Sequence, residues 1–137
     1  MPIVLDCSLA LAWGLPDETS TRADRFLARA SGDGFWVPAL WWYEMTNALT
    51  MAHRRHRVPA SDVMQLIELY GGLAIQTDTL LTPEVARRLH LLAQEYSLSA
   101  YDAAYLELAQ RRTLRLATLD RNLLRAARRA GIESARL

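Results

Sequence analysis

Residues 3–6 of the chain read Ile3-Val4-Leu5-Asp6, an apolar run that ends directly in an acid. A run without a polar position predicts a short strand buried on both faces, as in a parallel sheet. Similar runs recur at Phe35–Val37, Leu73–Ile75 and Leu114–Leu119. Helical patterns fill the intervals between these runs. The alternation of strands and helices predicts an α/β domain with a parallel central sheet.

Prolines, glycines and small polar residues mark the ends of the expected helices. The helices are expected at about residues 40–55, 59–71, 82–96, 99–112 and 121–131. The last of these follows Asp120, stops at Gly131 and carries apolar side chains on one side and arginines on another. Residues 132–137 leave room for a short edge strand.

The composition predicts one domain over residues 1–137, because 51% of the residues are hydrophobic and 23% are charged. Cys7 is the only cysteine, so no intrachain disulfide is available. No secretory leader opens the chain, and no apolar run approaches the roughly 20 residues that cross a bilayer. We therefore expect a cytoplasmic protein without a membrane segment.

The formal net charge of +1 hides an uneven distribution of cations. Residues 1–100 hold 8 Arg and 11 acids, whereas residues 101–137 hold 8 Arg and 4 acids. The chain has no lysine, which argues against a phosphoacceptor receiver domain, since its signalling chemistry uses a lysine on a late strand. Residues 6–10 lack the glycines of a dinucleotide-binding turn, which argues against an oxidoreductase of that class.

Two acids follow predicted buried strands directly, Asp6 after the first and Asp120 after the last. Ligands of open parallel sheets bind beyond the carboxyl ends of the strands, so both side chains are expected at the active-site crevice. The alternative is that each acid only caps the helix that follows it. The sequence leaves both interpretations open.

Asp102 stands in the first turn of a predicted helix, where Ser99 and Asp102 resemble a capping box. On the helical wheel Asp102 shares a face with Tyr105, whereas Glu107 and Arg111 are assigned to the solvent side. This placement directs the Asp102 carboxylate towards the interior. A buried charge needs compensation, which a metal ion would supply.

Glu44 lies at the edge of the apolar stripe of its helix, and Asn47 shares its flank one turn later. The alternative for Glu44 is a solvated glutamate at the rim. The case for a site rests on the set of four acids. Like charges at about 4 Å and an effective dielectric near 20 repel by about 4 kcal/mol per pair, so converging acids should bind cations or extra protons. All-oxygen ligands suit Mg²⁺ or Mn²⁺.

Four segments resemble the motifs of PIN-domain ribonucleases of the VapC-like toxin group, over essentially the whole chain. The segments are Val4-Leu5-Asp6-Cys7-Ser8, Trp42-Tyr43-Glu44-Met45-Thr46-Asn47-Ala48-Leu49, Leu98-Ser99-Ala100-Tyr101-Asp102-Ala103 and Leu116-Ala117-Thr118-Leu119-Asp120-Arg121-Asn122. The resemblance implies a three-layer α/β/α fold with a parallel sheet of four or five strands. It also implies a homodimer, a VapB-like antitoxin as partner and Mg²⁺-dependent cleavage of RNA.

The resemblance assigns the metal and catalytic roles to the four acids and supporting roles to three polar neighbours. The acids are Asp6, Glu44, Asp102 and Asp120, and the neighbours are Ser8, Asn47 and Thr118. The chain departs from some relatives at Asn122, where they carry a further acid. An amide binds metal more weakly than a carboxylate, which puts a second metal ion in doubt.

An acidic pocket repels RNA, so cations around its rim should hold the substrate. Arg121, Arg125 and Arg54 are the candidates, and the alternative for each is a solvated surface arginine. The competing functional hypothesis is a catalytically inactive PIN-like module that binds RNA or a protein.

Overall fold

A computed structural model describes residues 1–18 and 20–137. Its sheet has four parallel strands in the order β3-β2-β1-β4. They are β1 (Ile3–Leu5), β2 (Phe35–Pro38), β3 (Ile75–Asp78) and β4 (Arg115–Ala117). The parallel sheet predicted from the apolar runs is confirmed, with four strands.

The third strand begins two residues later than the sequence pattern indicates. Leu73 belongs to the turn after the preceding helix, where its N–H donates to the carbonyl of Tyr70. Ala74 supplies the carbonyl that accepts the N–H of Phe35. The apolar character of Leu73 reflects contact with the core from this turn rather than a place in the sheet.

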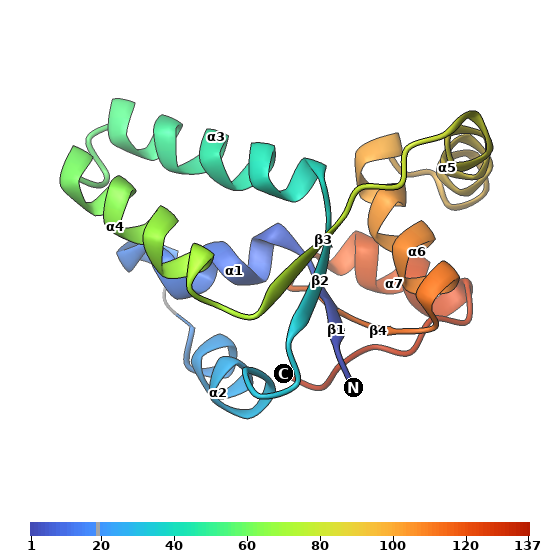
Figure 1. Cartoon of the computed structure of the whole chain (residues 1–137), viewed down its shortest axis with the longest axis horizontal. Helices are drawn as coiled ribbons and strands as arrows, with labels where there is room; N and C mark the ends of the chain where they lie inside the picture. The colour runs from blue at the N-terminus through green and yellow to red at the C-terminus, as the bar shows by residue number, and fades with distance from the viewer. Residues whose placement is uncertain (19) are drawn as a thin grey trace.

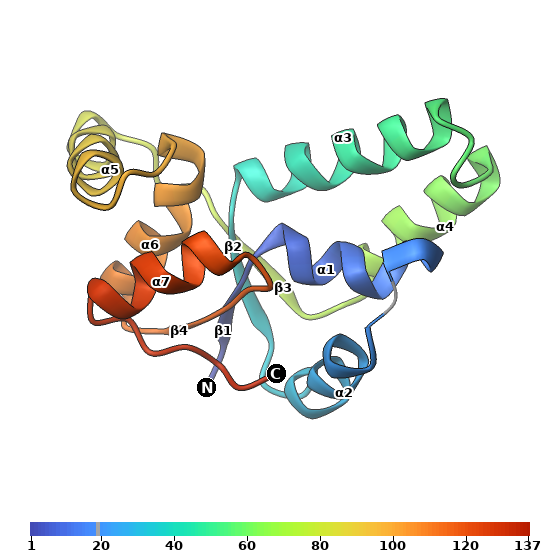
Figure 2. The same ribbon diagram turned by 180° about the vertical axis from the view of Figure 1, so that it is seen from behind.

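Helices cover both faces of the sheet. They are α1 (Cys7–Gly14), α2 (Thr21–Ala30), α3 (Leu40–Arg54), α4 (Ala60–Gly71), α5 (Pro83–Tyr96), α6 (Ala100–Arg112) and α7 (Arg121–Arg129), with a short 3₁₀ helix η1 at Pro16–Glu18. Figures 1 and 2 show α1 to α4 on one side and α5 to α7 on the other. The three-layer α/β/α arrangement is confirmed.

The C-terminal segment does not form the edge strand for which the sequence leaves room. A single parallel bridge joins Leu116 to Ser134, with hydrogen bonds from Leu116 N to Glu133 O and from Ala135 N to Leu116 O. The segment therefore closes the β4 edge over only a few residues.

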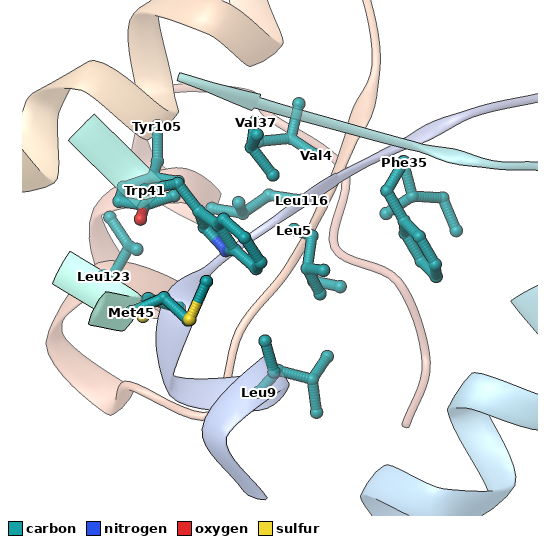
Figure 3. Close-up of a cluster of buried hydrophobic side chains, with 14 of the residues drawn as sticks. Val4, Leu5, Leu9, Phe35, Val37, Trp41, Met45, Tyr105, Leu116 and Leu123 are labelled. Carbon is teal, nitrogen blue, oxygen red and sulfur yellow. The ribbon is translucent and has the colours of Figure 1, made fainter. Parts of the chain in front are cut away.

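The core lies between the sheet and its helices, where every residue of β1 is buried. Figure 3 shows part of it, with Trp41 and Met45 of α3 facing side chains of β1 and β4. Gly14 allows α4 to approach α1 closely, because a Cβ at Gly14 would lie 2.4 Å from the hydroxyl oxygen of Tyr70. That hydroxyl donates to the carbonyl of Ala10 at 2.6 Å.

The assignment of Glu107 and Arg111 to the solvent side of α6 is wrong. The Glu107 side chain is only 3% exposed, and it accepts a hydrogen bond from Arg111 Nε at 2.7 Å. The same guanidinium reaches the buried carboxylate of Asp78 at the end of β3, with Nη2 2.6 Å from Oδ2. Arg111 thus neutralises two buried acids, Glu107 and Asp78, at once. This pairing allows both Glu107 and Arg111 to lie on the face of α6 that packs against the rest of the protein.

The helices in residues 1–18 and 20–137 are all too short or too polar to span a bilayer.

Candidate metal centre

The candidate centre lies above the carboxyl ends of β1 and β4, which are neighbours in the sheet. The chain leaves β1 into α1 on one side of the sheet and leaves β4 into α7 on the other (Figure 2). Connections that diverge at neighbouring strands mark the switch point of such a sheet, and ligands of this class of fold bind in the crevice outside the carboxyl ends of the strands there. Asp6 directly follows β1 and Asp120 directly precedes α7 at this point.

The Asp6 side chain bonds to two hydroxyl groups instead of capping the backbone of α1. Asp6 occupies the N-cap position, yet its carboxylate accepts no hydrogen bond from a backbone N–H group in the first turn of the helix. The Oδ2 atom accepts hydrogen bonds from Ser8 Oγ and Thr118 Oγ1, each at 2.6 Å. The capping interpretation of Asp6 is therefore wrong.

The Asp6 carboxylate is buried, and burial is the main reason why its pKa is raised. The hydrogen bonds from Ser8 and Thr118 oppose this shift, and the charges of Asp102 and Asp120 add to it. Two hydroxyl donors thus hold a carboxylate that burial and neighbouring acids both disfavour as an anion.

Asp120 does cap its helix, as the alternative interpretation predicts. One oxygen, Oδ1, accepts the backbone N–H groups of Asn122 and Leu123 at 2.8 and 3.1 Å. The Thr118 hydroxyl oxygen accepts the N–H of Asp120 at 2.9 Å and at the same time donates to Asp6. Thr118 therefore links Asp6 and Asp120 directly.

Glu44 approaches the centre from the second turn of α3, on the side of the sheet that α1 covers. Its Oε1 atom accepts the hydroxyl of Tyr105 on α6 at 2.7 Å. Burial raises the pKa of Glu44, the Tyr105 hydrogen bond lowers it, and the charges of Asp6 and Asp102 raise it further. Glu44 is half-buried rather than fully solvated.

Asp102 lies in the first turn of α6, on the opposite side of the sheet from Glu44. Ser99 caps this helix by accepting the Asp102 N–H at 3.0 Å. The carboxylate is half-buried, and burial followed by the charge of Asp120 raises its pKa. Ser99 opposes that shift.

These electrostatic effects connect all four acids. The charges of Asp102 and Asp120 act on Asp6, those of Asp6 and Asp102 act on Glu44, and that of Asp120 acts on Asp102. Residues separated by more than a hundred positions in the sequence therefore share one electrostatic environment. A cation bound among the four carboxylates would reduce their mutual repulsion. Without a cation, protonation of some of the carboxylates reduces it instead.

The hydrogen bonding leaves one oxygen available on three of the carboxylates. Within the part of the chain that the structure describes, no hydrogen bond reaches Oδ1 of Asp6, Oε2 of Glu44 or Oδ2 of Asp120. Each carboxylate is thus held by protein donors at one oxygen and free at the other. Hard cations such as Mg²⁺ take ligands of this kind, so the donor set fits.

The carboxylates do not form a closed chelate by themselves. Among residues 1–18 and 20–137, no three His, Cys, Asp or Glu side chains lie close enough to hold one ion as they stand. Bound Mg²⁺ usually keeps several waters and takes only one or two protein carboxylates directly. An ion held here would therefore be reached by some of the acids only through water.

The other predicted site residues differ in how close they lie to the centre. Ser8 contacts Asp6 and also accepts the N–H of Leu119 at 3.2 Å. Asn47 is exposed on α3, without a hydrogen bond to any of the four acids in the described residues. Arg54 ends α3, ten residues and so about 15 Å along the helix from Glu44.

Arg121 and Arg125 are exposed on α7, which begins at the crevice. Arg125 donates to the side chain of Asn122 at 2.6 Å. The Asn122 amide oxygen is therefore already bonded to a guanidinium.

The hydrogen bond that Tyr105 donates to Glu44 was not predicted from the sequence. The helical wheel places Tyr105 on the face of Asp102, but that pattern could not distinguish a core tyrosine from a donor to Glu44. Burial and the charges of Asp6 and Glu44 raise the pKa of Tyr105 well above its usual range, so the hydroxyl keeps its proton and donates. By contrast, burial raises the pKa of the Cys7 thiol, which agrees with a small core residue rather than a nucleophile.

The fold and the centre define an α/β domain with acids gathered at the carboxyl edge of a parallel sheet. The PIN domain family matches residues 3–129, and the chain belongs to this family. PIN-domain nucleases of the VapC type are generally dependent on divalent metal ions.

Comparisons with individual proteins agree with this assignment. The chain is 32% identical over 127 residues to Ribonuclease VapC3 of Pyrobaculum aerophilum, covering 90% of this chain and 92% of that protein. The crystal structure of PAE2754 from the same organism matches with a TM-score of 0.68 and 28% identity, over 92% of this chain and 79% of that one. VapBC2 from Rickettsia felis shares the fold at 8% identity, with a TM-score of 0.71 and 98% coverage of both chains.

Proposed function

We propose that this chain is a divalent-metal-dependent endoribonuclease that acts as the toxin of a toxin-antitoxin pair. The observation that carries the proposal is the arrangement of Asp6, Glu44 and Asp120, each held at one carboxylate oxygen and free at the other. The similarity to a protein named Ribonuclease VapC3 supports RNA as the substrate class.

In this proposal Asp6 and Asp102 are the principal ligands, and Glu44 and Asp120 complete the set directly or through water. The ion, Mg²⁺ or Mn²⁺, would lower the pKa of a bound water and stabilise the departing 3′ oxygen of the phosphodiester. Ser8 and Thr118 orient the Asp6 carboxylate, and Asp120 keeps one oxygen on the N-terminus of α7. In this proposal none of the four acids acts as the nucleophile.

RNA must be held by cations at the rim, since the four acids repel phosphate. We propose Arg121 and Arg125 for this role, because both are exposed on α7 near Asp120 and neither forms an ion pair in the described residues. Arg54 would contact only a longer substrate, given its place at the far end of α3. A binding series at rising salt would detect such contacts through the loss of affinity.

The partner of this toxin would be a VapB-like antitoxin that covers the acidic centre. The toxin and its RNA substrate would be in the cytoplasm. This part of the proposal rests on the resemblance of the four sequence motifs to VapC-like toxins, which the similarity to Ribonuclease VapC3 supports. It predicts that the co-expressed antitoxin suppresses cleavage.

We also propose that the chain forms a homodimer. Four of the eight large apolar side chains that are exposed in the described residues line one groove of about 280 Å³, namely Tyr43, Leu80, Leu81 and Tyr101. An apolar surface of this kind favours a protein partner over a polyanion. Light scattering should then give twice the 15.5 kDa mass of one chain.

The decisive experiment is cleavage of RNA labelled at either end, with Mg²⁺ present and after its removal by a chelator. Attack by metal-activated water predicts products with 5′-phosphate and 3′-hydroxyl ends, and no cleavage without the metal. Products with 2′,3′-cyclic phosphates, or cleavage that persists in the chelator, would contradict the proposed chemistry. Retention of RNA binding without any cleavage would instead favour the inactive PIN-like module, which the open spacing of the acids allows.

A further inference from the structure

Tyr105 connects the two helices that carry Glu44 and Asp102. Its side chain is fully buried, and Figure 3 shows it within the cluster of core residues. Its hydroxyl donates to Glu44 Oε1 at 2.7 Å. Tyr105 also follows Asp102 by three positions on α6, so the two side chains share one face of that helix.

We propose that Tyr105 is a positioning residue of the metal centre, which holds the Glu44 carboxylate in the orientation that presents Oε2 to the cation. This inference rests on the proposed metal site. Glutamate has several rotatable bonds, and fixing them at the moment of binding lowers affinity. A donor whose own side chain is fully buried, as that of Tyr105 is, fixes them beforehand.

The surroundings of Glu44 give this role to Tyr105. In the part of the chain that the structure describes, no arginine forms an ion pair with Glu44 and no other donor reaches its carboxylate. The orientation of a half-buried acid therefore depends on one hydroxyl. Second contacts of this type on ligand carboxylates are known to affect metal affinity.

Tyr70 shows what a tyrosine with a purely structural hydroxyl looks like in the same protein. It is also fully buried, and its hydroxyl donates to the backbone carbonyl of Ala10 at 2.6 Å. A buried tyrosine needs a partner for its hydroxyl, and a carbonyl is sufficient. Tyr105 instead donates to a candidate ligand, so loss of the two hydroxyls should have different consequences.

The test compares Tyr105→Phe with Tyr70→Phe by measuring Mn²⁺ binding to the whole protein without RNA, by calorimetry. We expect Tyr105→Phe to weaken Mn²⁺ binding roughly ten-fold and Tyr70→Phe to leave it unchanged. Urea unfolding of both variants would show whether each is folded under the conditions of the titration. Equal Mn²⁺ affinities of the two folded variants would overturn the inference.

A double-mutant cycle then asks whether Tyr105 acts through Glu44. In the Glu44→Gln background, Tyr105→Phe should cause no further loss of Mn²⁺ affinity, because the carboxylate that it orients is gone. An undiminished second loss would refute this route of action. Failure of the unaltered protein to bind Mn²⁺ at all would overturn the proposed metal site and this inference with it, whereas normal wild-type binding with an unaffected Tyr105→Phe overturns the inference alone.

Discussion

Replacement of Asp6 by Asn is expected to reduce RNA cleavage about a thousand-fold while making the protein harder to unfold. The loss corresponds to about 4 kcal/mol of transition-state stabilisation, the scale on which a bound metal ion contributes. The Asn side chain can still accept hydrogen bonds from Ser8 and Thr118, which both contact Oδ2 of Asp6. It removes a buried charge, so we expect a gain of about 1 kcal/mol in the free energy of unfolding.

The gain in stability should depend on pH in a defined direction. Because burial raises the pKa of Asp6 in the folded state, protonation of Asp6 stabilises the fold. That stabilisation is fully present below the ordinary pKa of 3.8 and is lost as the pH rises through the raised value. The advantage of Asp6→Asn should therefore be seen at neutral pH and disappear in acid.

Cleavage of labelled RNA with Mg²⁺ and urea unfolding in a chelator measure the two effects. Asp24→Asn is the matched control, since Asp24 is exposed on α2, away from the crevice. This control should change neither quantity. If Asp6→Asn cleaved RNA as fast as Asp24→Asn, Asp6 could not be a principal metal ligand.

The sequence predicted β1 because a strand that is buried on both faces has no polar position. Ile3–Leu5 is therefore identifiable without any neighbour, and Asp6 is identifiable as the residue at its carboxyl end. The orientation of the Asp6 side chain is a different matter. Asp6 and Asp120 have the same sequence context, yet only Asp120 caps its helix, since Asp6 is held by Thr118 from the neighbouring strand.

The errors occurred where distant side chains determine burial. Glu107 is an acid on a helix and looks solvated by type, but Arg111 and the end of β3 surround it. The contact between Tyr105 and Glu44 joins positions 61 residues apart, so helical periodicity could not reveal it. Local sequence patterns predict helices and strands. Which charged side chains form ion pairs or hydrogen bonds depends on which helices and strands pack against one another.

Arg111→Met is expected to destabilise the protein by about 3–5 kcal/mol, the largest effect on stability that we predict for one substitution. Arg111 bonds Asp78 through both terminal nitrogens and bonds Glu107 through Nε. Both acids are nearly inaccessible to water, so the substitution leaves two buried carboxylates without their main donor. Arg88 and Arg112 remain only at 3.4 and 3.6 Å, and each is more exposed than Arg111.

The same substitution at Arg87 isolates the effect of burial, because Arg87 forms an equally short ion pair, 2.7 Å from Glu84, at the surface. Urea unfolding should show a loss of under about 1 kcal/mol for Arg87→Met. A triple variant, Asp78→Asn with Glu107→Gln and Arg111→Met, should recover most of the stability that Arg111→Met loses, since it leaves no buried charge unpaired. Comparable losses for Arg111→Met and Arg87→Met would mean that water reaches Asp78 and Glu107 and that the cluster does not hold α6 against β3.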